Sequence, residues 1–379
     1  MQYRKFGKFD FKVSSLGFGC MRLPYLNGDD GNIDEKEAIR LIRYSIDNGV
    51  NYIDTAYPYH KGNSEIIVGK ALKDGYRDKV NLATKCPVWL VEKYEDFHKY
   101  LDNQLEKLQT DHIDMYLLHA LSKERWEKLK ELNVFKFLEE AVISGKIKHP
   151  GFSFHDELPV FKEIVDSYDW DFCQIQYNYM DTNYQAGTEG LKYAASKGMA
   201  VIIMEPLKGG KLAKNPPKEV QDIWNKAPIK RSPADWALRW IWNHEEVTAI
   251  LSGMGEIEQV IENINIAENS LPNSMNSYEL NLVNEAKNMY NKLIKVDCTG
   301  CNYCMPCPFG VNIPKNFALY NESSMYNDIK GYSFAYNNSL SKEAKANNCQ
   351  ECGLCETKCP QNISIREHLK EVHSTLNQV

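Results

Sequence analysis

The sequence predicts an α/β protein in which a closed (β/α)8 TIM barrel is followed by a small, mainly helical domain. Before residue 267, short apolar runs alternate eight times with helical stretches. Eight strand-then-helix units in order imply a closed parallel barrel rather than an open sheet. Eight of the eleven cysteines crowd into residues 298–359. We therefore place the barrel at residues 1–275 and a helical linker with a cysteine-rich domain at residues 276–379.

The predicted strands are short runs rich in apolar, β-branched and aromatic residues, as expected of strands covered on both faces. They lie at residues 15–19, 52–54, 81–84, 115–118, 147–153, 172–176, 200–204 and 247–251. Amphipathic segments between them predict helices at residues 34–48, 64–73, 95–107, 135–144 and 233–243. The N-terminal residues 2–12 predict a hairpin over the barrel floor, and residues 278–295 predict one more helix.

Composition excludes several classes of protein. The apolar share of 43% and the charged share of 25% are ordinary for a globular chain of 379 residues. A net charge of -6 gives no general attraction to nucleic acid or to anionic lipid. No apolar run approaches the ~18 residues of a spanning helix, and the first residues lack the apolar core of a signal peptide. We expect a cytoplasmic protein with no nucleic-acid or membrane partner.

The cysteines form two runs that each end in Cys-Pro. The second run has the bacterial ferredoxin spacing C-x2-C-x2-C-x3-C-P, in which three thiolates share one tight loop and the fourth ligates another cluster. The first run is one residue shorter before its last cysteine. The paired runs resemble two-cluster ferredoxins, and the 41 residues between them and the phrase CPFGVNIP are closer to the helical type. The resemblance implies two [4Fe–4S] clusters with crossed ligation: Cys298, Cys301, Cys304 and Cys359 on one, and Cys349, Cys352, Cys355 and Cys307 on the other.

Two four-cysteine zinc sites are the alternative interpretation of the same runs. Zinc sites usually pair two CxxC units and lack the following proline, so the spacing favours iron–sulfur. Disulfides are opposed by a reducing cytosol. The three upstream cysteines, Cys20, Cys86 and Cys173, have no ligand spacing and are expected to be small buried side chains.

Ionisable residues lie where the predicted strands end, which is where a (β/α)8 barrel carries its chemistry. Asp54 ends the second strand, Lys85 follows the third, and His119 follows the fourth. The loop after the second strand carries Tyr57 and Tyr59. Each residue alone has an ordinary structural explanation, such as helix capping, solvent exposure or a core hydrogen bond. Together, an acid, a cation, an imidazole and two phenols face one mouth from adjacent strands.

These residues resemble the aldo-keto reductase family over roughly residues 3–267. The matching phrases are DTAYPYHKGNSE, ATKCP, TDHIDMYLLHA, GKIKHPGFSFH and EQVIENI. The resemblance implies a catalytic tetrad of Asp54, Tyr59, Lys85 and His119. Within it, Tyr59 rather than Tyr57 takes the tyrosine role because it lies five residues after the aspartate. A tyrosine of pKa ~10 is a weak acid at neutral pH. We expect Lys85, anchored by Asp54, to lower that pKa while His119 orients the substrate oxygen.

The resemblance also implies an NAD(P)H cofactor. Ser153 and Gln174 match positions that hold the nicotinamide carboxamide, and Glu262 and Asn263 match positions at the adenine end. Elsewhere the chain departs from the family, since Phe154 replaces an asparagine and Met204 stands where a tyrosine stacks on the nicotinamide. Where many members carry Lys, Ser and Arg for the 2′-phosphate of NADP, this chain has Gly253, Met254 and Gln259. NADH and NADPH therefore both stay open as cofactors.

The leading hypothesis is an oxidoreductase that acts on a small carbonyl or alcohol substrate with NAD(P)H. Hydride transfer is a two-electron step that needs no cluster, so the cysteine-rich domain calls for its own explanation. One is electron exchange with a redox protein partner. The other is a structural role, in which the bound clusters stabilise a domain that is too small to fold alone. The hypothesis from another class is an electron-transfer or redox-sensing protein on a catalytically unused barrel.

Overall fold

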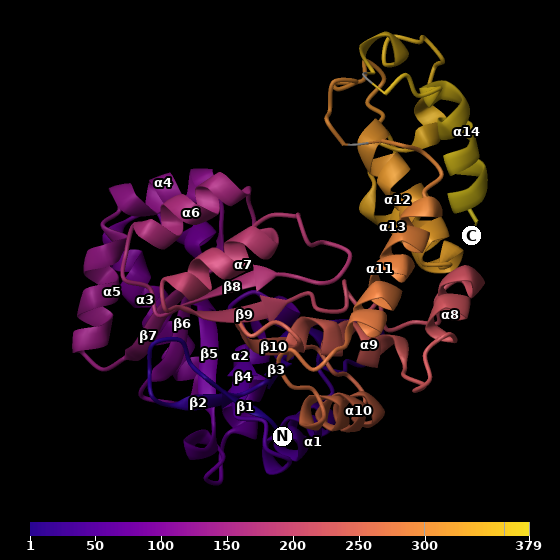
Figure 1. The fold of residues 1–379 in the computed structure, drawn as a ribbon. Coiled ribbons are helices and arrows are strands. Elements are labelled where there is room, and N and C mark those ends of the chain that lie inside the picture. Colours follow the sequence, from indigo (N-terminus) through magenta and orange to yellow (C-terminus); the bar gives the residue numbers. More distant parts are fainter. Residues whose placement is uncertain (299, 360, 379) are drawn as a thin grey trace. The chain divides into compact units, whose positions relative to one another are not determined.

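The computed structural model describes residues 1–298, 300–359 and 361–378 (Figure 1). Eight strands close into a barrel in which every neighbouring pair is parallel and β10 pairs with both β9 and β3. This confirms the predicted fold. The barrel strands are β3 (Leu16–Gly19), β4 (Tyr52–Asp54), β5 (Asn81–Cys86), β6 (Ile113–Leu121), β7 (Ile147–Phe154), β8 (Phe172–Gln176), β9 (Ala200–Met204) and β10 (Val247–Ser252).

All eight predicted strands are found, and β4, β8 and β9 have the predicted bounds. The largest difference is β6, which continues to Leu121 because its pairing with β7 resumes at Leu121 and Phe154 after an irregularity. The longer strand is what brings His119 into the sheet rather than the loop. Strand interiors are almost wholly buried, as expected for strands between an inner core and an outer helical layer.

Helices follow the strands and surround the barrel (Figure 1). The first begins where the Asp34 carboxylate accepts a hydrogen bond of 3.1 Å from the Glu37 amide, the usual N-cap arrangement. The helices of the barrel are α1 (Glu35–Asp47), α2 (Ser64–Ala71), α3 (Tyr94–Leu108), α4 (Lys123–Glu131), α5 (Val134–Ile143), α6 (Leu158–Asp166), α7 (Gly187–Ser196), α9 (Pro233–Trp242) and α10 (Ile257–Glu268). Among the described residues, no helix is both long and apolar enough to cross a membrane.

The N-terminal hairpin closes the floor of the barrel, as predicted. Strands β1 (Tyr3–Lys5) and β2 (Lys12–Ser14) pair antiparallel. Phe6, between them, is fully buried, and its ring lies 5.6 Å from that of Phe172 in β8. The hairpin therefore seals apolar side chains inside the barrel from water.

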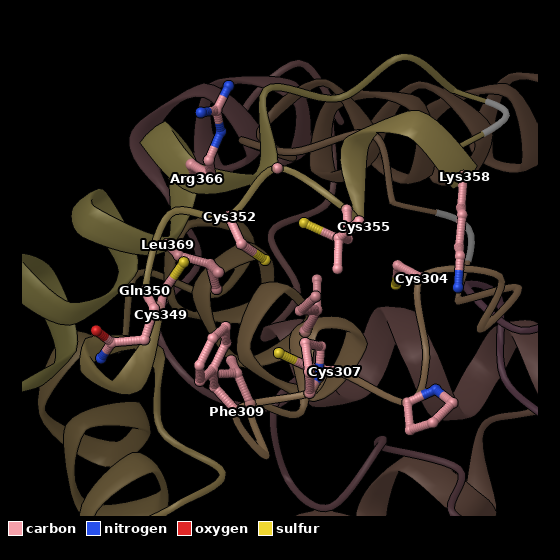
Figure 2. A pocket seen from close by; sticks show the side chains of 16 residues that line it. Cys304, Cys307, Phe309, Cys349, Gln350, Cys352, Cys355, Lys358, Arg366 and Leu369 are labelled. Carbon is pink, nitrogen blue, oxygen red and sulfur yellow. The ribbon is translucent and has the colours of Figure 1, made fainter.

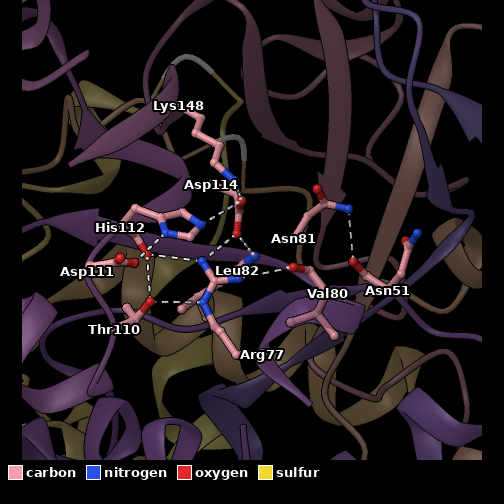
Figure 3. Close-up of polar contacts among 10 residues, drawn as sticks. All are labelled: Asn51, Arg77, Val80, Asn81, Leu82, Thr110, Asp111, His112, Asp114 and Lys148. Atoms are coloured by element: carbon pink, nitrogen blue, oxygen red, sulfur yellow. Dashed lines mark hydrogen bonds and ion pairs between the residues drawn. The ribbon is translucent and has the colours of Figure 1, made fainter. Parts of the chain in front are cut away.

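A polar network around the buried Asp114 carboxylate joins the beginnings of β5 and β6 (Figure 3). The Asp114 carboxylate is 2.7 Å from the Arg77 guanidinium and 2.8 Å from Lys148 Nζ, and it accepts a hydrogen bond of 3.0 Å from the Leu82 amide. Burial alone would raise the pKa of Asp114, but these partners lower it overall. Because the network lies at the strand N-termini, opposite the catalytic face of such barrels, we assign it to stability.

The chain divides into two compact units, one of residues 1–210 with 234–277 and the other of residues 211–233 with 278–379. The second unit is mainly helical, as expected. Its buried core includes Phe317, Tyr336 and Val372. Its helices are α8 (Lys218–Trp224), α11 (Ser277–Lys292, whose first residue belongs to the first unit), α12 (Ile313–Met325), α13 (Ile329–Ser339) and α14 (Ile365–Leu376).

One segment of this second unit comes from the middle of the barrel sequence. Residues 211–233 follow β9, yet three of their lysines form ion pairs of 2.6 Å with the C-terminal helices. The pairs are Lys211 with Glu322, Lys214 with Asp328, and Lys226 with Glu285. The division of the chain is therefore not a single cut in the sequence.

Candidate active site and cysteine clusters

The predicted tetrad meets at the carboxyl ends of β4, β5 and β6. Asp54 is the last residue of β4 and pairs with Ala83 of β5. Lys85 lies two residues beyond Ala83 and therefore on the same face, because side chains alternate along a strand. Lys85 in turn pairs with Leu117 of β6, and His119 lies two residues beyond that. Because neighbouring strands of the barrel are staggered, the three side chains lie at successive heights on its inner face.

Lys85 is the centre of the tetrad and is fully buried. Its Nζ donates hydrogen bonds of 2.7 Å to Asp54 Oδ1, 2.8 Å to the Thr55 carbonyl and 3.4 Å to Tyr59 Oη. Tyr59 begins a short 3-10 helix (Tyr59–Gly62), which turns its ring over the Lys85 ammonium at 4.9 Å. The ring of His119 lies 6.1 Å from that of Tyr59. The structure therefore brings all four predicted residues together.

The protonation state of Tyr59 differs from the expectation. Burial is the largest effect and raises the pKa of Tyr59, while Lys85 lowers it by less. The expected net depression is therefore absent, because removing a phenolate from water costs more than one ammonium restores. The pKa of Lys85 is pulled down by burial, but Asp54 and Tyr59 raise it overall. At neutral pH the site holds a protonated phenol beside an ammonium.

His119 is held neutral. Burial lowers its pKa well below 6.5, and Lys85, His155 and Arg125 lower it further. Its Nδ1 is buried without a hydrogen-bond partner among the described residues, and so is Asp54 Oδ2. A neutral imidazole can donate one hydrogen bond to a substrate oxygen without competing for its proton.

Tyr57 does not join the tetrad. The Lys107 ammonium lies 4.0 Å from its ring centroid, and the ring makes an edge contact with Tyr100 at 5.5 Å. Tyr57 therefore packs against α3, away from Lys85. The geometry agrees with the choice of Tyr59 made from the five-residue spacing.

Sequence reasoning missed a buried carboxylate beneath the tetrad. Glu65, fully buried in α2, accepts hydrogen bonds from Thr84 (2.8 Å) and from Gln104 (2.6 Å), and it lies 3.3 Å from Lys107 Nζ. Gln104 also donates a hydrogen bond of 3.0 Å to the Lys85 carbonyl. The network fixes the backbone that carries Lys85. Its only sequence signal was the glutamate that closes the phrase DTAYPYHKGNSE.

Three of the four predicted cofactor residues are buried near the same barrel end. The Ser153 hydroxyl accepts a hydrogen bond of 2.7 Å from the Ala120 amide, while the Gln174 Oε1 atom is buried with no partner among the described residues. Asn263 in α10 donates a hydrogen bond of 3.0 Å to Ser252. The fourth, Glu262, lies on the exposed side of α10. An orphaned buried amide oxygen fits a ligand that brings its own N–H, such as a carboxamide.

The departures from the family pattern have local causes. Phe154 is buried and packs against Phe161 of α6, so it faces the helical layer. Met254 is also buried, and the Gln259 side chain accepts a hydrogen bond of 3.0 Å from the Gly255 amide.

Arg22, which sequence reasoning also missed, covers Gly253. A Cβ placed at Gly253 would lie 3.1–3.3 Å from the aliphatic stem of Arg22, so glycine leaves room for that stem. The arginine therefore brings a cation into this region from the loop after β3. No spacing in the sequence connects positions 22 and 253, which meet only because β3 and β10 close the barrel.

The eight clustered cysteines surround two spaces in the second unit. One is lined by Cys349, Cys352, Cys355 and Cys307, with Cys304 at its edge (Figure 2). The other is lined by Cys298, Cys301, Cys304 and Cys359. Cys359 of the second run thus lies with the first run, and Cys307 of the first lies with the second. Burial is the largest effect that raises the pKa of the Cys298 and Cys304 thiols, and nearby Cys301 and Cys359 raise both further.

The remaining cysteines are separate from these spaces. Cys20, Cys86 and Cys173 are fully buried in the barrel, as expected of small apolar side chains. Among the described residues, no three Cys, His, Asp or Glu side chains come close enough to bind a single metal ion. The clustered cysteines are instead spread around spaces that a larger group would fill.

Comparison with known proteins agrees with both parts of the chain. The profile of the aldo/keto reductase family matches residues 15–280, more than half of the chain. The chain belongs to the aldo/keto reductase family. A 4Fe–4S dicluster domain profile matches residues 297–363. This member of the family is therefore an oxidoreductase with an iron–sulfur domain of the dicluster type.

Individual relatives cover the barrel part. An uncharacterised oxidoreductase of Bacillus subtilis, YrpG, is 27% identical over 312 residues, which are 72% of this chain and 92% of the relative. An NADH-specific methylglyoxal reductase of Escherichia coli is 27% identical over 68% of this chain and 91% of its own length. The holo structure of an aldo-keto reductase of Bacillus halodurans, AKR11C1, aligns with a TM-score of 0.63 at 27% identity, covering 76% of this chain and 96% of that one.

Proposed function

We propose that the barrel catalyses NAD(P)H-dependent reduction of a small carbonyl compound, and the reverse oxidation of the alcohol. The observation that carries the proposal is the placement of Lys85, whose ammonium contacts both Asp54 and Tyr59 at the barrel end that also presents His119. The named activities of the relatives support the same reaction class.

The chain's own residues account for the proton. Tyr59 donates its hydroxyl proton to the carbonyl oxygen as that oxygen gains negative charge, and the phenolate left behind is stabilised by Lys85. Asp54 keeps Lys85 charged and in place. His119, neutral, hydrogen-bonds the same oxygen and orients it. The bound dinucleotide supplies the hydride to the carbonyl carbon, so that C=O becomes CH–OH.

The cofactor residues fit a nicotinamide dinucleotide. Gln174 has a buried acceptor with no protein partner, which suits the amide N–H of a carboxamide. Ser153 lies in β7 beside it, since Ser153 and Gln174 are paired across the two strands. We place Glu262 and Asn263 of α10 at the adenine end.

The test compares two tyrosine variants. Tyr59→Phe should abolish carbonyl reduction, a loss of about a hundredfold or more, while leaving NAD(P)H affinity unchanged because the ring stays. Lys85→Met should be comparably severe. Tyr57→Phe is the matched control and should retain activity, since Tyr57 packs against α3. Aldehyde-dependent NAD(P)H oxidation and fluorescence titration give the two readouts; wild-type turnover in Tyr59→Phe would overturn the assignment.

For the second unit we propose two [4Fe–4S] clusters with crossed ligation, serving electron exchange with a redox partner. The grouping of Cys359 with the first run and Cys307 with the second supports this scheme. Anaerobically purified protein should carry about eight irons and eight sulfides. Cys359→Ala should damage the cluster held by the first run and spare the other, as followed by electron paramagnetic resonance. Four irons after full reconstitution, or stoichiometric zinc, would contradict the scheme.

A redox-sensing protein on an unused barrel is the second candidate. The replacement of the stacking tyrosine by Met204 favours it, because less of the cofactor's ring would be held. The assembled tetrad opposes it. A cluster-loaded protein that binds neither NADH nor NADPH would decide for this candidate.

A further inference from the structure

Arg125 is a cation close to the tetrad that forms no ion pair with any residue that the structure describes. Arg125 lies in the first turn of α4, directly after β6, the strand that carries His119. Its Nη1 donates a hydrogen bond of 2.7 Å to the carbonyl of Ala120, the residue next to His119. This hydrogen bond anchors the guanidinium to the residue that follows His119, whose imidazole we propose orients the substrate oxygen.

Trp89 links this guanidinium to the catalytic histidine. Its ring lies 5.2 Å from the His119 ring, and the Arg125 guanidinium lies 5.6 Å from the Trp89 ring. Trp89 comes from the short 3-10 helix after β5 (Val88–Leu90), so segments after two neighbouring strands bring the arginine and the indole beside the same imidazole. A guanidinium over the face of an indole gains a cation–π contact and can still donate hydrogen bonds from its edge.

In the part of the chain that the structure describes, no carboxylate forms an ion pair with Arg125. Among the described residues, it makes the Ala120 hydrogen bond and the Trp89 contact and no ion pair. Asp54 is paired with Lys85, and Asp156 accepts hydrogen bonds from the Lys123 and Glu157 amides, so neither carboxylate forms an ion pair with Arg125. A guanidinium has five N–H donors, and a carboxylate accepts two of them in a bidentate pair.

We propose that the preferred substrates are carbonyl compounds that also carry a carboxylate, and that Arg125 binds this carboxylate while the carbonyl oxygen meets Tyr59 and His119. The proposal rests on the proposed function and names its substrate class. Reduction is unchanged in its balance: the hydride goes to the carbonyl carbon, the Tyr59 proton goes to its oxygen, and the carboxylate takes no part.

Matched substrate pairs test the proposal. Succinic semialdehyde and butanal differ by a carboxylate in place of a methyl group, as do glyoxylate and acetaldehyde at shorter reach. The wild-type, cluster-loaded enzyme should show a kcat/KM at least about tenfold higher for one of the charged members than for its neutral partner, and the ratio should shrink with added salt. Equal values within both pairs would overturn the proposal, although turnover of the neutral aldehydes would leave the proposed function standing.

Variants identify the residue. Arg125→Met should raise KM for the charged aldehyde about tenfold with little change in kcat, and leave the neutral aldehyde within about twofold. Arg125→Lys, which keeps the charge but not the planar fork, should fall between. Lys128→Met, on the same helix but paired with Glu92, is the control. Equal losses for charged and neutral aldehydes would mean that Arg125 only supports the loop after β6. If the wild type reduces no aldehyde at all, it is the proposed function that fails.

Discussion

Tyr59 shows how burial and charge compete within one side chain. Its hydroxyl is 3.4 Å from the Lys85 ammonium, yet burial outweighs that contact and the pKa of the phenol is raised. The tyrosine therefore arrives at the reaction fully protonated. In the proposed reaction, Lys85 stabilises the phenolate as the proton leaves, so its effect falls on the transition state.

The pH dependence of reduction follows from these two residues. His119 has a pKa well below 6.5 and becomes charged only in acid, while Tyr59 has a pKa above 10.0 and loses its proton only in base. We predict that kcat/KM for reduction is flat between about pH 7 and about pH 9. A pH series with one aldehyde measures it. A rise or fall of kcat/KM within that pH range would show that His119 or Tyr59 titrates there.

The preference between NADH and NADPH also depends on a few single residues. We predict that NADH binds at least as tightly as NADPH, because Gly253, Met254 and Gln259 provide no cation for a 2′-phosphate. Fluorescence titration with both dinucleotides measures this. A tenfold preference for NADPH, ~1.4 kcal/mol, would contradict it. Arg22, whose stem covers Gly253, would then be the cation responsible, and its loss in Arg22→Met should remove the preference.

At the scale of elements, the eight short apolar runs that alternate with helical stretches predicted the barrel. The ionisable residues at the ends of these runs predicted where its site lies. Asp54, Lys85 and His119 lie at the ends of consecutive predicted strands, and the resemblance to the aldo-keto reductase family implied that they form a tetrad with Tyr59. Arg125 and Glu65 did not follow, because their roles depend on which face of α4 or α2 meets the strand ends. Residues 211–233 look like barrel sequence, and contacts with later helices, among them the lysine ion pairs, place them in the second unit.

The polar network at the beginnings of β5 and β6 should contribute to the stability of the fold, and Asp114 is the residue that tests this. Asp114→Asn removes a buried charge that pairs with Arg77 and Lys148, and should lower the free energy of unfolding by about 3 kcal/mol. Because the folded pKa of Asp114 is below the usual 3.8, the wild-type advantage should be present above that pH and vanish as pH falls through the folded value. Denaturant unfolding at several pH values measures both.

The neighbouring Asp111→Asn is the control for that measurement. Asp111 is almost fully exposed and, among the residues that the structure describes, its one ion pair is with His112, so its replacement should leave stability nearly unchanged. An equal loss of unfolding free energy in Asp114→Asn and Asp111→Asn would show that the network around Asp114 contributes no more to stability than an exposed ion pair does.

At the scale of the whole molecule, one chain combines an aldo/keto reductase barrel with an iron–sulfur domain of the dicluster type. The second unit has a modest helical core and eight cysteines that surround two spaces. Clusters there would stabilise a small domain as well as carry electrons. In either role, the tetrad is complete without them, since Asp54, Tyr59, Lys85 and His119 all belong to the barrel unit. We therefore propose that carbonyl reduction is direct hydride transfer from the dinucleotide, without the clusters.

Isotope transfer tests that claim most directly. The cluster-loaded enzyme is supplied, without oxygen, with an aldehyde and with NADH or NADPH that carries deuterium at both positions of its transferable ring carbon. Direct transfer should place one deuterium on the carbinol carbon of the product for each dinucleotide oxidised, and Tyr59→Phe should give no product. Dinucleotide oxidation that yields unlabelled alcohol, or none, would show that the electrons leave through the clusters, and would contradict direct hydride transfer.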